Sequence, residues 1–205
     1  LLNSYLNEMS KIALKYGGTI DKFVGDAILI FFGDPETNGE KADATSCVLM
    51  ALEMRERMKF MRQIWEDEGI SKPLNIRIGI NTGYCNVGNF GSEDRLDYTI
   101  IGGEVNLASR LESNASVGQI LVSHETYSLI KNSITCEERE EINVKGLAHK
   151  VRTYQVIDKK EKNEKGVTKL KDNYEGFSLS IDLDVSRKAE VIASLKNALA
   201  KIQKN

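Results

Sequence analysis

Apolar residues in the first segment recur every three to four positions, the spacing of one face of an α-helix: Leu2, Tyr5, Leu6, Met9, Ile12, Ala13 and Tyr16. The pair Gly17-Gly18 follows and is expected to end this helix. Two runs rich in β-formers come next, Thr19–Val24 and Ala27–Phe32, joined by Gly25-Asp26. A Gly-Asp pair between two such runs predicts a β-hairpin.

A second helical stripe predicts one long helix over about residues 40–68, with Cys47, Met50, Met54, Met58, Met61 and Trp65 on its apolar face. Methionine-rich faces occur both in cores and in adaptable binding grooves, and core packing is the favoured interpretation here. Strands are then predicted at Leu74–Asn81 and Cys85–Phe90, around a Thr82-Gly83 turn.

The next part of the chain alternates short predicted elements. Residues 91–97 are polar and are expected to form a loop, followed by an extended piece at 98–101, a helix at about 104–115, a strand at 120–122, a helix at 124–130 and a closing strand pair at 136–144 and 151–157. This order predicts an α+β fold with a mainly antiparallel sheet.

Composition changes after this point. Residues 158–173 are dominated by charge and predict a solvated linker. Within 174–205, apolar and polar residues first alternate, at 177–184, and then recur at helical spacing. A lone strand and helix cannot bury both faces unaided. We therefore expect this strand-helix extension to dock on the main domain or on a second subunit.

Charge and cysteine content narrow the function classes. The 205 residues carry a net charge of −2, which offers no basic field for nucleic acid. Cys47, Cys85 and Cys136 lack any metal-ligand spacing, which favours reduced thiols in a cytoplasmic protein, or in the cytoplasmic part of a membrane-anchored receptor. The chain starts at Leu1 in mid-pattern, so we expect sequence before it, including a sensor or regulatory domain.

Three groups of residues could carry chemistry. Asp26, at a hairpin tip beside Gly25, suits a hard divalent cation, although Gly-Asp is also a common turn. Asn106 and Arg110 lie four apart and share one helix face, where they could bind a ribose and a phosphate or simply face solvent. Lys145, before a glycine, could reach a triphosphate or be an ordinary turn lysine.

In this order, these residues resemble the catalytic domain of class III adenylate and guanylate cyclases, the bacterial adenylate cyclases in particular. The runs that match are Asp21–Ile28, Ile78–Gly83, Val87–Ser92, Tyr98–Gly102, Val105–Arg110 and Asn143–Gly146. The resemblance covers residues 1–157 and implies a ferredoxin-like βαββαβ core of the nucleotidyl cyclase type. It also implies a homodimer, arranged head to tail, with active sites shared between the subunits.

The resemblance assigns roles to several residues. Asp26 corresponds to one of two aspartates that hold two Mg²⁺ or Mn²⁺ ions, Asn106 to the residue that orients the ribose, and Arg110 to the residue that stabilises charge on the α-phosphate. Lys145 corresponds to the lysine that binds the triphosphate. The family's other metal aspartate lies on a first strand with a Phe-x-Asp-Ile motif, which we expect upstream of Leu1.

Lys22 and Thr99 fall at the two base-selecting positions of the family. Adenine presents an acceptor at N1 and a donor at N6, which Lys22 and the Thr99 hydroxyl can match, whereas guanine presents the opposite pattern. ATP is therefore the expected substrate. The implied reaction is in-line attack of the ribose 3′-oxygen on the α-phosphorus, which yields cyclic AMP and pyrophosphate.

Two other functions remain open. The domain could be a catalytically silent module that binds nucleotide or dimerises, because the chain lacks the family's first strand. It could also be a different palm-type enzyme such as a diguanylate cyclase. The hairpin here reads Val24-Gly25-Asp26-Ala27 rather than the Gly-Gly-Asp/Glu-Glu-Phe of that class, which disfavours the second alternative.

Overall fold

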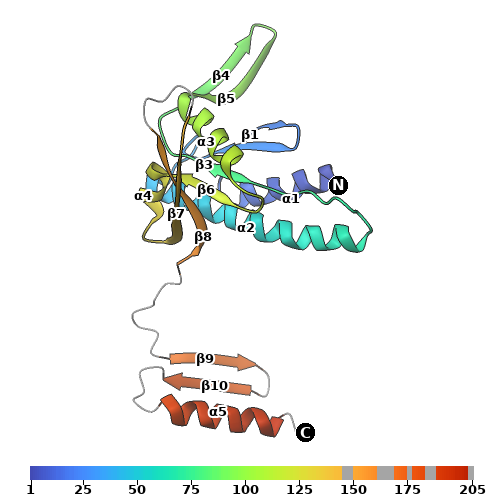
Figure 1. Cartoon of the computed structure of the whole chain (residues 1–205), viewed down its shortest axis with the longest axis vertical. Coiled ribbons are helices and arrows are strands. Elements are labelled where there is room, and N and C mark those ends of the chain that lie inside the picture. The colour runs from blue at the N-terminus through green and yellow to red at the C-terminus, as the bar shows by residue number, and fades with distance from the viewer. Residues whose placement is uncertain (145–149, 161–168, 175–176, 183–187, 203–205) are drawn as a thin grey trace. The chain divides into compact units, whose positions relative to one another are not determined.

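The computed structural model describes residues 1–144, 150–160, 169–174, 177–182 and 188–202. The chain divides into two compact units, Leu1–Glu161 and Lys162–Asn205. In the first unit the elements follow one another as α1 (Leu2–Lys15), β1 (Thr19–Val24), β2 (Ala27–Phe31), α2 (Glu40–Asp67), β3 (Ile78–Ile80), β4 (Asn86–Ser92), β5 (Arg95–Ile101), α3 (Gly103–Asn114), β6 (Ile120–Ser123), α4 (His124–Ile130), β7 (Ile134–Ile142) and β8 (Val151–Lys159) (Figure 1).

A four-stranded sheet in the order β3-β6-β8-β7 forms the centre of this unit. Only β3 and β6 run parallel; the other pairs are antiparallel. Side chains alternate across β6, because Ile120 and Val122 pack with residues of α2 and α4, whereas Leu121 packs with α3. The sheet is therefore covered by helices on both faces, and the predicted α+β class with a mainly antiparallel sheet is confirmed.

The methionine stripe of α2 lies in a core cluster rather than in an open groove. Met54, Met58, Met61 and Trp65 are buried there against α1 and the apolar side chains of the β1–β2 hairpin. Core packing, the favoured interpretation of this stripe, is thereby confirmed. The same cluster packs the β1–β2 hairpin against α1 and α2.

Two strand boundaries differ from the predictions. Residues 91–97 do not form a loop, because β4 continues to Ser92 and β5 begins at Arg95, paired residue by residue as a hairpin. Most side chains of this hairpin are exposed, so its sequence lacks the apolar alternation that marks a half-buried strand. The strand predicted over Leu74–Asn81 is confined to Ile78–Ile80, where β6 supplies a partner.

The second unit contains β9 (Lys169–Tyr174), β10 (Phe177–Asp182) and α5 (Lys188–Ile202). β9 and β10 pair antiparallel, so the strand predicted at 177–184 has a partner over its described residues, 177–182. β9 occupies a stretch that we expected within the linker. Its sequence is mostly polar, so apolar spacing does not predict a strand there, and the strand is defined by the pairing of its backbone with β10. Among the described helices, none is both long and apolar enough to cross a membrane.

Candidate active site

The β1–β2 hairpin presents Asp26 at its tip. Val24 pairs with Ala27, and Gly25 has φ of 65°, the positive value that a two-residue turn with glycine first requires. Asp26 is exposed, and its charge reaches α1. Burial, and secondly the negative charge of Asp26, raise the pKa of the Tyr5 phenol on α1. The hairpin therefore places a carboxylate at the edge of the domain, close to α1.

Helix α3 carries the predicted Asn106 and Arg110 on its exposed face, while Leu107 and Leu111 anchor the opposite face in the core. Neither the Asn106 nor the Arg110 side chain forms a hydrogen bond or ion pair with another described residue. Both side chains are thus open to water or to a ligand.

Gly79 sets the position of α3. A Cβ at Gly79 would overlap the backbone of Ala108 and of Glu112, so β3 and α3 approach as closely as only a glycine allows. At the start of the helix, the Asn81 amide donates to the backbone oxygen of Glu104 at 3.2 Å and to its carboxylate at 2.6 Å. These contacts fix α3 against the end of β3.

Lys22 and Thr99, separated by 77 positions, come together between β1 and β5. The Lys22 ammonium donates to Thr99 Oγ1 at 2.9 Å, and Thr99 Oγ1 donates to Asp21 Oδ2 at 2.7 Å. Thr99 is only 6% exposed. Sequence reasoning missed Asp21 as a site residue, because a regular strand would direct its side chain away from that of Lys22.

The structure leaves two parts of the predicted site unassembled. Lys145 lies outside the described residues, so its assignment stays a prediction. Across the described part of the chain, no group of three or more His, Cys, Asp or Glu side chains could hold a metal ion. Asp26 alone suits Mg²⁺ or Mn²⁺ as one oxygen ligand, and it does not form a complete site.

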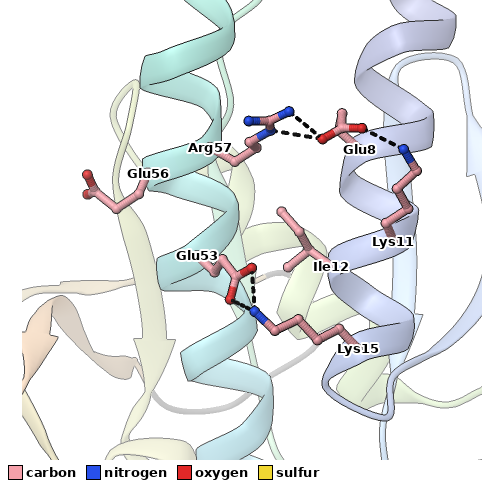
Figure 2. A pocket seen from close by; sticks show the side chains of 7 residues that line it. All are labelled: Glu8, Lys11, Ile12, Lys15, Glu53, Glu56 and Arg57. Atoms are coloured by element: carbon pink, nitrogen blue, oxygen red, sulfur yellow. Dashed lines mark hydrogen bonds and ion pairs between the residues drawn. The ribbon is translucent and has the colours of Figure 1, made fainter.

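A charged crevice of about 400 Å³ lies elsewhere, between α1 and α2, lined by Glu8, Lys11, Ile12, Lys15, Glu53, Glu56 and Arg57 (Figure 2). Figure 2 shows its cations paired with its carboxylates: Arg57 contacts Glu8 at 2.7 Å, and Lys15 contacts Glu53 at 2.7 Å. Lys11 and Arg57 share Glu8, so each cation that lines the crevice already has a carboxylate partner.

Family comparison decides what this arrangement belongs to. The model of the adenylate and guanylate cyclase catalytic domain matches residues 1–158. The chain belongs to this family. The solved structure of the adenylyl cyclase CyaB from P. aeruginosa is 65% identical, with a TM-score of 0.75 over 77% of this chain and 80% of that one. The guanylyl cyclase Cya2 is 35% identical, with a TM-score of 0.73 over 80% and 81% of the two chains.

Among curated relatives, the terminal-differentiation-specific adenylate cyclase of Dictyostelium discoideum is 35% identical over 83% of this chain. The chain spans only 8% of that protein, and less than a third of the other first relatives that it matches. The similar proteins thus include both adenylyl and guanylyl cyclases. Membership of the nucleotidyl cyclase family therefore leaves the choice of base to the residues of the site.

Proposed function

We propose that this chain is the catalytic domain of an adenylate cyclase, which converts ATP into 3′,5′-cyclic AMP and pyrophosphate. The observation that carries the proposal is the contact between Lys22 and Thr99. An ammonium can only donate, which suits N1 of adenine, and the threonine oxygen can accept from the adenine 6-amino group. Guanine would set its N1 proton against the ammonium and its O6 against the threonine oxygen.

The exposed face of α3 supplies the groups for the reacting end of the nucleotide. Asn106 orients the ribose, so that its 3′-oxygen lies in line with the α-phosphorus. Arg110 stabilises the charge that develops on the α-phosphate as the bond to pyrophosphate breaks. Lys145 completes this set by binding the triphosphate as a point charge.

Asp26 is proposed as one ligand of two Mg²⁺ or Mn²⁺ ions, which the family pattern shares between two aspartates. Two such ions, when bound, would stabilise both the entering and the leaving oxygen of an in-line displacement. The contribution of this chain is the position of the Asp26 carboxylate at a glycine turn, where the backbone leaves room for a close ligand.

A homodimer with shared active sites completes the proposal. The β4–β5 hairpin projects from the first unit (Figure 1) and exposes the large apolar side chains of Phe90, Leu96, Tyr98 and Ile101. An exposed apolar surface of this kind is typical of a protein–protein interface. Thr99 lies on the same hairpin, so a partner seated there would lie beside the base contacts. The free thiols fit a cytoplasmic location.

The direct test is turnover by the intact protein. With ATP and Mn²⁺ it should form cyclic AMP, and Arg110→Ala should lower the rate about 100-fold or more, because a group that stabilises developing charge is lost. Absence of product above the Arg110→Ala control, with ATP still bound, would establish the alternative of a silent nucleotide-binding module. That alternative is favoured by the absence, among the described residues, of a group of three or more side chains that could hold a metal ion.

A further inference from the structure

Strand β1 contains an irregularity at Asp21. Ile20 pairs with Ile30 and Lys22 pairs with Leu29, so Asp21 is an extra residue between two consecutive pairs. In a regular strand, neighbouring side chains point to opposite faces, whereas a bulge re-aims a side chain. Here the bulge lets Asp21 and Lys22, although adjacent in sequence, both reach the hydroxyl of Thr99.

The hydrogen bonds of this trio fix the direction of the Thr99 proton. A threonine hydroxyl has one proton and two acceptor lone pairs, an ammonium only donates, and a carboxylate only accepts. Because Lys22 donates to Thr99, the Thr99 proton must go to Asp21, and the bonds measure 2.9 and 2.7 Å. One lone pair of the threonine oxygen remains, and a ligand can meet it only with a donor.

Burial places Asp21 behind this contact rather than in contact with the ligand. The Asp21 side chain is 1% exposed, whereas that of Lys22 is 46% exposed. The carboxylate also lies 3.5 Å from the Lys22 ammonium, so it restrains both base-selecting groups at once. Asp21 therefore acts on a nucleotide only through Thr99 and Lys22.

We propose that Asp21 is a positioning residue that sets the base specificity of this site: it holds the Thr99 hydroxyl as an acceptor, so that the site takes 6-aminopurine nucleotides over 6-oxopurine nucleotides. The inference rests on the proposed function, because it deepens the assignment of Lys22 and Thr99. Without Asp21, the Thr99 proton is free to rotate toward O6 of a guanine base, and one of the two mismatches against GTP disappears.

The test compares ATP with GTP in four forms of the intact protein: wild type, Asp21→Ala, Thr99→Val and the double variant. For Asp21→Ala we expect the ratio of kcat/KM for ATP to that for GTP to fall about tenfold, the value of one mismatched polar contact. In the Thr99→Val background the same substitution should change the ratio no further, because Asp21 acts on base choice through the hydroxyl that is already absent, and Lys22 remains a donor with or without Asp21.

A structural role alone would give a different pattern. It would lower kcat/KM for both nucleotides equally, or lower the ratio again in the Thr99→Val background, and either result overturns the proposal. Asp21→Leu is a second variant that keeps the branched shape and fills the space without an acceptor. It should reduce the ATP:GTP ratio of kcat/KM as Asp21→Ala does. The proposal can therefore still be tested if the alanine variant fails to fold.

Glu53→Ala is the matched control. Glu53 also accepts from a lysine and a hydroxyl, but it lies on α2, away from the base contacts, and its loss should leave the ATP:GTP ratio unchanged. Displacement of a fluorescent ATP analogue by ATP and by GTP gives the ratio of the two binding affinities without turnover, and we expect Asp21→Ala to lower that ratio as well. An inactive wild type would therefore refute the proposed cyclase activity, while the binding ratio of Asp21→Ala still decides the role of Asp21.

Discussion

This domain contains two sets of a lysine, a hydroxyl and a carboxylate, and the hydrogen bonds within the two sets are arranged differently. In the base-selecting set, the Thr99 hydroxyl is the centre: it accepts from Lys22 and donates to Asp21. In the set on α1 and α2, the carboxylate is the centre, because Glu53 accepts from both Lys15 and the Tyr16 hydroxyl.

The two sets also differ in how deeply the carboxylate is buried. The Asp21 side chain is 1% exposed, whereas the Glu53 side chain is 34% exposed. An exposed ion pair contributes little, about 0–1 kcal/mol, because water already solvates both partners. A buried carboxylate with a hydroxyl partner imposes a proton direction instead. The same three groups thus form the proposed base-selecting contact in one place and a helix–helix contact in the other.

The largest expected difference between the sets is in catalysis. Lys22→Glu should lower kcat/KM for ATP about tenfold or more, since a carboxylate faces the acceptor N1 of adenine and an unmatched buried contact costs about 1–3 kcal/mol. Lys15→Glu makes the same charge change on α1 and should leave kcat/KM within about twofold. Steady-state kinetics with ATP measure both. Unchanged ATP kinetics in Lys22→Glu would mean that the base contacts are assigned to the wrong residues.

The next largest difference between the two sets should be the loss of unfolding free energy when the carboxylate is removed. Asp21→Ala leaves a buried hydroxyl without its acceptor, so we expect it to reduce the free energy of unfolding by about 1–3 kcal/mol. Glu53→Ala removes a partly exposed ion pair and should cost about 0–1 kcal/mol. Urea unfolding of the two variants gives both values. Equal losses would show that burial does not distinguish the two carboxylates.

The Tyr16 phenol sharpens the comparison at high pH. The hydrogen bond to Glu53, then burial and the Glu53 charge, raise the pKa of Tyr16 to about 12 from 10.0. Because the pKa of Tyr16 is raised in the folded state, its contribution to stability is fully present below pH 10 and is lost as the pH rises toward 12. In Glu53→Gln the pKa of Tyr16 should fall back toward 10, which titration of the tyrosine ultraviolet absorbance detects against a Tyr16→Phe reference. An unchanged titration would contradict the role of the Glu53 charge.

The smallest expected effect is the acid response of the α1–α2 crevice. Hydrogen bonds from Lys15 and Tyr16 lower the pKa of Glu53 from 4.5, and bonds from Lys11 and Arg57 lower that of Glu8. Lowered pKa values stabilise the fold above the unfolded pKa, and this contribution is lost as pH falls through the folded values. Thermal unfolding of wild type against Glu8→Gln/Glu53→Gln should therefore differ at neutral pH and converge in acid. Added salt should narrow the neutral difference as well, because these charges are partly exposed.

Of the set formed by Lys22, Thr99 and Asp21, only the first two residues could be predicted from the sequence. Lys22 and Thr99 were assigned through family motifs, and the fold class followed from hydrophobic spacing. Asp21 was missed because a bulge depends on how a strand pairs, which the spacing of apolar residues does not record. The strands at 95–97 and 169–174 were missed because backbone pairing defines them, and the spacing of apolar residues does not record that pairing. Lys145 remains a prediction from the family pattern.

The most direct measurement is the rate of cyclic AMP and cyclic GMP formation by the intact protein at equal ATP and GTP concentrations with Mn²⁺. Cyclic AMP should form at least about tenfold faster in the wild type, from the mismatch of guanine at Lys22 and Thr99. That preference should fall about tenfold in Asp21→Ala, which loses one of the two mismatches, and stay unchanged in Glu53→Ala. Equal formation of both products by the wild type, or a preference that the loss of Asp21 leaves undiminished, would contradict the account.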